Sequence, residues 1–178
     1  MHRISVTREM SNDVAAVWSV LDDFGSVYKY NPGVKSSSIL GQKATGLGAQ
    51  RICNFYDGSS LKETITKYEP NHGYSFRLHD FALPLKKATS HFKLTPLSSG
   101  RSLLSITLEF VPKFGPLGWL MGKVMMRPML RKALRALTKG LEEHMNTGEL
   151  IGKDGALMGQ TQRIKHQHAG TPEMGVGR

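Results

Sequence analysis

A run of strand-like segments followed by one long amphipathic helix limits what this chain can fold into. Each segment alternates polar and apolar residues or is rich in β-formers, and each ends at a turn signal such as Asp57-Gly58. The segments cover residues 34–40, 49–56, 61–68, 73–79, 88–94 and 102–111. Strands that follow one another without intervening helices are typical of a meandering antiparallel sheet, whereas a parallel sheet would need helical crossovers.

The long helix is predicted by apolar residues spaced four, three, four and four positions apart, namely Leu130, Leu134, Leu137, Leu141 and Met145. Pro128 precedes them, so it either starts this helix in its first turn or kinks a continuous one. A sheet with one apolar face must be covered, and this helix is the only predicted element long enough to do so. A curved sheet wrapped around one helix leaves room for a ligand cavity.

The ends of the chain complete the predicted domain. A first strand is expected around Ile4–Arg8, a short helix over Ser11–Leu21 with Ser11 as its N-cap, and a second short helix over Ser26–Tyr30. After Asn146 the periodicity stops and glycines recur. We therefore expect one domain over residues 1–146 and a flexible, Gly-rich tail over residues 147–178.

Four short motifs occur in order along the chain. They are Val17-Trp18 with Asp22-Asp23-Phe24-Gly25 and Tyr30-Asn31-Pro32-Gly33-Val34, then Gly46-Leu47-Gly48-Ala49-Gln50-Arg51, Glu63-Thr64-Ile65, and Leu83-Pro84-Leu85. Together they resemble the START-like (SRPBCC) superfamily in its polyketide cyclase/dehydrase branch. The resemblance covers roughly residues 4–145. It implies an α+β helix-grip fold, in which a curved antiparallel sheet of about six or seven strands wraps around a long C-terminal helix, with two short helices after the first strand. The family includes lipid carriers, ubiquinone-binding proteins, aromatic polyketide cyclases and the plant abscisic acid receptors.

Arg51 and Glu63 are the residues most able to carry chemistry. They lie on neighbouring predicted strands, and Arg51 shares its face with Cys53 and Phe55. If these faces point inward, an arginine and a glutamate lie inside an apolar pocket, where charges must be paired or hydrogen-bonded. Such a pair would anchor a carbonyl, hydroxyl or carboxylate of a ligand, or would be a structural ion pair at a sheet edge.

Other candidate ligand-binding residues come from the resemblance and from the apolar pattern. By similarity to the abscisic acid receptors, Phe76, Leu78, Ala88 and Ser90 would line the pocket, while Asn31 and Ala88 stand where those receptors have a lysine and a tyrosine. These two departures argue against hormone-type carboxylate recognition, and Ala88 would enlarge the cavity. The strand 102–111 contributes Leu108 to a core or cavity wall. Met121 and Met125 suit a pliable wall or lid, or fill the core.

Half of the net charge of +10 comes from one part of the chain. Residues 113–146 hold seven Lys and Arg against two Asp and Glu. Basic residues flank the apolar segment 114–130, so residues 113–131 could contact an anionic membrane; the alternative is a solvated helix face. Nucleic acid is the least favoured partner, because residues 130–146 carry no aromatic side chain for base stacking.

The remaining composition narrows the chemistry. Cys53 is the only cysteine, so no intramolecular disulfide can form, and the start of the chain has no apolar signal segment. We expect a cytoplasmic, membrane-peripheral protein without metal or cofactor. Its predicted function is to bind and transport a lipophilic small molecule such as a lipid, a quinone or a polyketide-like aromatic. The alternative is a cyclase or dehydratase that uses Arg51 and Glu63 for acid–base catalysis, with a non-catalytic binding protein preferred.

Overall fold

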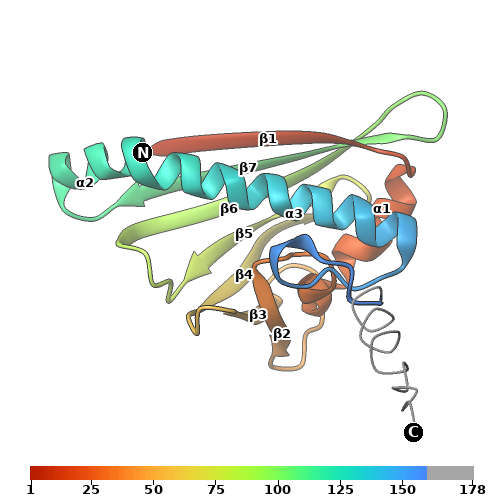
Figure 1. Cartoon of the computed structure of the whole chain (residues 1–178), viewed down its shortest axis with the longest axis horizontal. Helices are drawn as coiled ribbons and strands as arrows, with labels where there is room; N and C mark the ends of the chain where they lie inside the picture. The colour runs from red at the N-terminus through yellow and green to blue at the C-terminus, as the bar shows by residue number, and fades with distance from the viewer. Residues whose placement is uncertain (160–178) are drawn as a thin grey trace, which may run out of the picture.

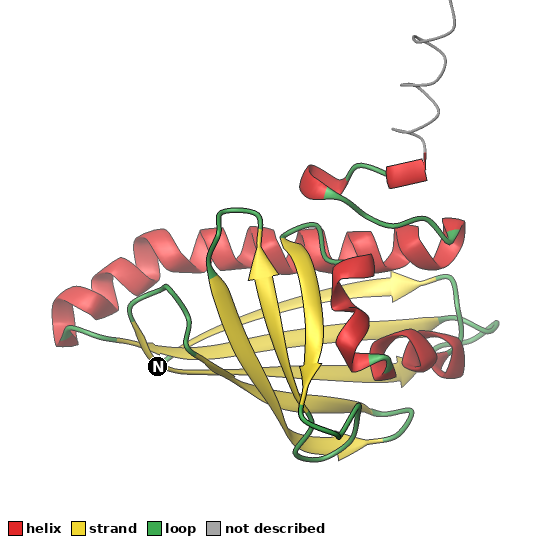
Figure 2. Cartoon of the chain, turned by 90° about the horizontal axis from the view of Figure 1, so that it is seen from below, coloured by secondary structure: helices red, strands yellow, loops and turns green. Residues whose placement is uncertain are grey.

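The computed structural model describes residues 1–159 and contains a seven-stranded antiparallel sheet that curves around one long helix (Figures 1 and 2). The strand order is β1-β7-β6-β5-β4-β3-β2, so β2 to β7 form a meander and the first strand pairs with the last. The predicted α+β helix-grip architecture is confirmed. The strands are β1 His2–Met10, β2 Val34–Leu40, β3 Gln50–Phe55, β4 Ser60–Glu69, β5 Gly73–His79, β6 Leu85–Pro96 and β7 Ser102–Pro112.

Strict alternation explains why the central strands face the core on one side. In β7 every second residue is buried, from Ser102 to Pro112, as expected for a strand with one face in the core. Ile106 and Phe110 from this face are 0% and 1% exposed. The sheet therefore offers one continuous apolar surface, which the C-terminal helix covers.

Two short helical elements follow β1, as predicted, but with different boundaries. The helix α1 spans Val14–Asp22 and the 3₁₀ segment η1 spans Phe24–Lys29. The expected N-cap at Ser11 is wrong. Asp13 caps α1 instead, because its carboxylate accepts a hydrogen bond from the Ala16 amide at 2.8 Å. The second element begins two residues earlier than the predicted Ser26.

The C-terminal helix is continuous from residue 115 to residue 147, and Pro128 lies within it. The chain runs through α2 (Gly115–Met121), the π-helical segment η2 (Gly122–Met126) and α3 (Arg127–Thr147). The residues at both junctions keep right-handed helical backbone angles. A proline within a helix removes one amide and crowds the carbonyl four residues before it, and the wide π turn directly before Pro128 accommodates both effects.

The second half of α3 packs tightly on the rest of the domain. Leu137 and Leu141 are buried there, at 8% and 0% exposure. A Cβ atom at Gly140 would lie 2.2 Å from the backbone oxygen of Tyr30. The helix therefore approaches η1 so closely that only glycine fits at position 140.

The first part of the expected flexible tail also packs on the domain. Ile151 is 1% exposed, and its amide donates a hydrogen bond to the Lys29 carbonyl at 2.8 Å. Ile151 and Leu157 form an isolated antiparallel bridge, around the short turn η3 (Lys153–Gly155). Ordered packing thus extends past residue 146, and the remaining part of the expected tail, residues 160–178, lies outside the described residues.

Candidate functional site

A cavity of about 280 Å³ lies between the inner face of the sheet and α3. Its wall is almost entirely apolar. The sheet contributes Val34, Cys53, Phe55, Leu61, Phe76, Leu78, Ser90, Phe92 and Leu108, and α3 contributes Leu130, Ala133, Leu134 and Leu137. The strands supply these side chains because the face that alternation turns inward borders the cavity. An apolar chamber with few polar groups is the usual form of a small-molecule site.

The charged part of this wall is the pair Arg51 and Glu63, which are directly opposite each other on β3 and β4. The Arg51 Nε donates to the Glu63 carboxylate, and its Nη1 donates to the Phe24 carbonyl at 2.5 Å. The guanidinium lies over the Phe24 ring, 4.0 Å from its centre. Both side chains are nearly fully buried. A buried charge pair persists only when its members also find further partners, and this pair has them.

The electrostatics of the pair keep Arg51 charged. Burial alone would lower the pKa of the guanidinium, but the neighbouring Glu63 carboxylate outweighs burial and raises that pKa. Burial raises the pKa of the Cys53 thiol to about 12, and the Glu63 carboxylate adds to this effect. Cys53 is therefore a neutral, unreactive residue of the cavity wall, and it packs there as a small apolar side chain.

Two tyrosine hydroxyls lie close to this pair without a partner. Among residues 1–159, the hydroxyl oxygens of Tyr30 and Tyr74 are buried and have no hydrogen-bond partner. Burial raises the pKa of Tyr30 to about 12, although Arg51 acts in the opposite direction. Neither tyrosine is recognisable from the sequence as a site residue, because nothing in its local pattern distinguishes it from an ordinary core aromatic. Buried polar groups are normally satisfied, so these two hydroxyls are unusual in being unpaired next to a buried ion pair.

The structure places eight of the eleven predicted site residues along the cavity: Asn31, Arg51, Phe55, Glu63, Phe76, Leu78, Ser90 and Leu108. The other three lie elsewhere. Ala88 is buried in a neighbouring apolar cluster, between the partners Leu78 on β5 and Phe110 on β7. Met121 packs against the same cluster. Met125 is 67% exposed, so its expected place in the cavity wall is wrong.

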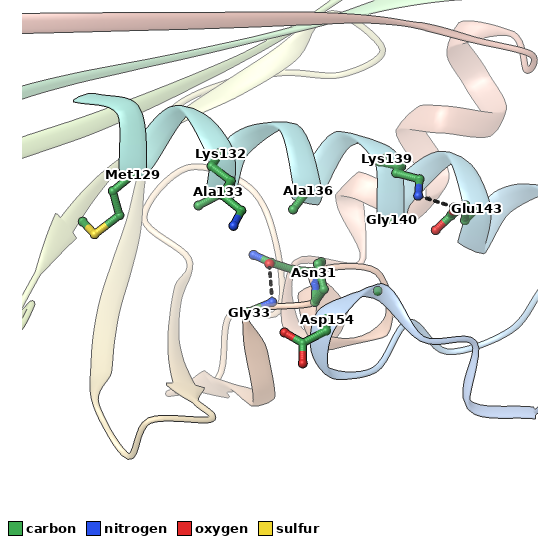
Figure 3. Close-up of a pocket in the computed structure, with 12 residues that line it drawn as sticks. Asn31, Gly33, Met129, Lys132, Ala133, Ala136, Lys139, Gly140, Glu143 and Asp154 are labelled. Atoms are coloured by element: carbon green, nitrogen blue, oxygen red, sulfur yellow. Dashed lines mark hydrogen bonds and ion pairs between the residues drawn. The ribbon is translucent and has the colours of Figure 1, made fainter. Parts of the chain in front are cut away.

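A surface groove of about 500 Å³ adjoins the cavity (Figure 3). Its lining includes Lys132, Ala136 and Lys139 from one face of α3. Three residues border both spaces, namely Asn31, Gly33 and Ala133. The two spaces therefore share part of their walls.

Local hydrogen bonding fixes the loop on the far side of the groove. The Asn31 side-chain oxygen accepts a hydrogen bond from the Gly33 amide at 3.0 Å, which shapes the turn before β2 (Figure 3). Lys139 forms an ion pair with Glu143 at 3.3 Å, one turn further along the helix. The predicted binding residue Asn31 therefore has a defined structural role at the boundary between groove and cavity.

Among residues 1–159, no three His, Cys, Asp or Glu side chains are grouped closely enough to hold a metal ion. No helix in that range has the length and hydropathy needed to cross a bilayer.

Comparison with known proteins agrees with the architecture. The sequence matches the family described as polyketide cyclase / dehydrase and lipid transport over residues 1–146. A search of curated proteins by sequence gave no match. Among solved structures, XoxI from Bacillus cereus superposes with a TM-score of 0.69 at 16% identity, covering 83% of this chain and 97% of that chain.

Two further neighbours carry descriptive names. A START superfamily protein from Mycobacterium smegmatis has a TM-score of 0.64 at 21% identity, covering 82% of this chain and 98% of that one. The Zhui aromatase/cyclase from a Streptomyces species has a TM-score of 0.60 at 15% identity, covering 82% and 93%. At these identities the likeness concerns the fold alone. The family match spans the whole helix-grip domain, and on that ground this chain belongs to the polyketide cyclase/dehydrase and lipid transport family.

Proposed function

We propose that this protein binds, and carries, a lipophilic small molecule in the cavity between its sheet and α3. The observation that carries the proposal is the apolar chamber of about 280 Å³ with one buried ion pair in its wall. Ligand pockets commonly measure about 300–1,000 Å³. The size of this cavity therefore favours a compact ligand, or the leading part of a longer one whose remainder lies in the adjoining groove.

Arg51 and Glu63 give the ligand its orientation in this proposal. The pair is held in place by the Phe24 carbonyl and ring, so its position does not depend on a ligand. A ligand carbonyl or hydroxyl that reaches the pair would gain a hydrogen bond in a low-dielectric setting. The apolar remainder of the ligand would lie along Phe76, Leu108 and Leu134. This combination favours a mostly apolar molecule with one polar end.

A cyclase or dehydratase role is the weaker candidate. General acid–base catalysis works best with a group whose pKa lies near the working pH. The hydroxyl of Tyr30 and the thiol of Cys53 both have pKa values raised to about 12. The Glu63 carboxylate is committed to Arg51 and lies 3.9 Å from the Cys53 thiol. These features suit a fixed polar anchor better than a proton shuttle.

Two neighbouring alanines on α3 provide a matched test of this site. Ala133 borders both the cavity and the groove, whereas Ala136 borders only the groove. Ala133→Trp should fill part of the chamber where it borders the groove, and Ala136→Trp should leave the chamber open.

The measurements are native mass spectrometry of gently purified protein and titration with the apolar dye anilinonaphthalene sulfonate. We expect a co-purified lipophile or saturable dye binding in the natural protein and in Ala136→Trp, with at least about tenfold weaker binding in Ala133→Trp, which is a loss of ~1.4 kcal/mol. Absence of both signals in the natural protein, or equal binding by both variants, would refute the proposal. Activity towards a polyketide that is lost in Glu63→Gln while dye binding persists would favour the enzyme.

A further inference from the structure

The helix tip, residues 114–129, carries an unusual amount of exposed apolar surface. Twelve large apolar side chains of the described residues are exposed, and seven of them belong to this tip: Phe114, Leu117, Trp119, Leu120, Val124, Met125 and Met129. Their exposures range from 48% to 74%. The tip extends past the edge of the sheet beside the start of β1 (Figure 1). Concentrated apolar exposure on a protruding element marks an interaction surface.

Packing does not explain why these residues are apolar. The buried residues of the tip are Gly118, Gly122 and Met126, and the half-buried Met121 packs against the same cluster as Met126. A Cβ atom at Gly122 would lie 2.7 Å from the His2 ring, so the tip sits directly on β1. Trp119 also contacts the His2 ring, with 5.7 Å between the ring centres. The other large apolar side chains of the tip are left for the surface that faces away from the fold.

Phe114 strengthens this argument through its backbone. It has a φ of 68°, in the left-handed region, and its side chain is 67% exposed. Bulky residues rarely adopt this conformation, and glycine or asparagine fills such positions at lower cost. A strained and exposed phenylalanine contributes little to folding, so its presence indicates a use at the surface.

The charges around the tip select the partner. Residues 110–141 contain seven Lys and Arg and not one Asp or Glu. Lys113 and Lys123 are exposed within the tip region, and the Lys123 ammonium lies 5.4 Å from the centre of the Trp119 ring. Within residues 1–159, neither lysine forms an ion pair with a carboxylate. Basic side chains around an exposed tryptophan and aliphatic residues complement an anionic lipid surface.

We propose that the helix tip, residues 114–129, docks this protein on an anionic lipid bilayer. Phe114, Leu117, Trp119 and Leu120 enter the region between headgroups and acyl chains, while Lys113 and Lys123 contact lipid phosphates. A second copy of the chain fits this surface less well, because docking tip to tip would bring the same lysines against each other.

Docking of the tip would also place the ligand site near the lipid. Met129 belongs both to the tip and to the lining of the groove, and Ala133 follows it one helical turn later at the cavity. Met129 and Ala133 therefore connect the docking surface with the groove and the chamber along one face of the helix. The docking proposal does not depend on the cavity being occupied.

Vesicle sedimentation tests the docking directly. The natural protein should sediment with vesicles of equal parts phosphatidylcholine and phosphatidylglycerol and remain in solution with phosphatidylcholine alone. High salt should weaken the sedimentation, because exposed charges are screened. Trp119 emission should shift to the blue on binding, and Trp119→Phe should remove that shift, since Trp18 is only 7% exposed in the core.

Matched variants test whether vesicle binding depends on the tip or on exposed apolar residues in general. Leu117→Ser with Leu120→Ser should reduce the apparent affinity about tenfold or more. Leu47→Ser, at a 59% exposed leucine in the turn between β2 and β3, should leave it unchanged.

Charge and backbone variants complete the set. Lys123→Glu should weaken binding at least about fivefold, and Lys35→Glu, on the opposite edge of the sheet, should not. Phe114→Asn keeps a residue that tolerates the left-handed backbone, so it should fold normally while binding vesicles less.

Three results would overturn the proposal. They are failure of the natural protein to sediment with the anionic vesicles, equal binding by the tip variants and their controls, and a dimer in solution that the tip variants dissociate. Dye binding by the Leu117→Ser, Leu120→Ser variant is measured in parallel. If this variant keeps dye binding but loses vesicle binding, docking is established separately from the cavity. If it loses dye binding but keeps vesicle binding, only the cavity proposal is refuted.

Discussion

The two ends of the C-terminal helix use apolar residues in opposite ways. Towards the end of α3, Leu137 and Leu141 turn inward and are nearly fully buried. At the tip, Leu117 and Leu120 turn outward and are 74% and 52% exposed. The same residue type on the same helix thus stabilises the fold at one end and leaves apolar area in water at the other.

This difference separates folding from interaction within one element. Burial of a leucine contributes about 1.5–3 kcal/mol to stability, and an exposed leucine contributes almost none of it. The packed end therefore holds the sheet closed around the cavity. The apolar residues of the tip are not needed for folding and are available for an interaction. We therefore expect substitutions at the packed end to lower stability and substitutions at the tip to weaken binding.

The largest effect is expected where the packed region encloses charge, at Glu63. Glu63→Ala leaves the Arg51 guanidinium buried with its carboxylate partner removed, and should lower the free energy of unfolding by about 3–5 kcal/mol. Urea unfolding followed by circular dichroism measures this loss. The double variant Arg51→Met, Glu63→Leu should recover most of it, because the uncompensated charge is gone. A Glu63→Ala protein as stable as the natural one would contradict the role of the pair.

A leucine at each end of the helix tests the comparison itself. Leu141→Ala should cost about 2–5 kcal/mol through lost burial and the cavity left behind. Leu117→Ala should change stability by less than about 0.5 kcal/mol, because the side chain is exposed. Chemical denaturation of both variants measures the difference. Similar losses of stability at the two positions would contradict the different roles of the two helix ends.

The close approach of α3 to η1 predicts a smaller loss. Gly140→Ala adds a methyl group where the Tyr30 carbonyl oxygen already lies, so the helix must shift. We expect a destabilisation of about 1–3 kcal/mol, although alanine is the better helix former by about 1 kcal/mol. Thermal unfolding detects it, and a gain in the unfolding midpoint would show that the helix has room there.

The smallest effect is expected in the pH dependence of stability, through His2, which lies where the tip packs on the sheet. Burial lowers the pKa of His2, and the charges of the N-terminus and Arg127 act in the same direction. The unfolded chain therefore binds this proton more readily than the folded one, so stability should fall as pH drops below about 6.5. Comparing unfolding midpoints of the natural protein and His2→Gln at neutral and mildly acidic pH isolates this contribution. An equal pH dependence in both would exclude it.

The sequence predicted the sheet and the ion pair well because both follow from local rules. Alternation defines which residues of a strand share a face, and consecutive hairpins place Arg51 beside Glu63. The Leu and Met spacing of the last helix likewise identified the element that covers the sheet. These signals need no knowledge of contacts between distant parts of the chain.

The structure differs from the sequence-based predictions where contacts between distant parts of the chain determine the position of a residue. Met125 has the same residue type as a wall methionine, but the π turn and the end of the sheet leave it in solvent. Asp13 rather than Ser11 caps α1, because β1 runs on to Met10. Ile151 packs against η1 only because the end of α3 arrives there. None of these outcomes can be deduced from neighbouring residues alone.

The π turn sets the rotational phase between the two ends of the helix. Gly118, Gly122, Met126, Leu130 and Leu134 face the rest of the domain at intervals of four residues. A regular α-helix turns about 100° per residue, so four-residue steps drift by about 40° each. The wider turn over 122–126 absorbs this drift. Deleting a single residue there would restore an ordinary helix but rotate the tip by about 100°. The apolar side chains that now face solvent would be re-aimed, while the half of α3 that covers the core stayed in register.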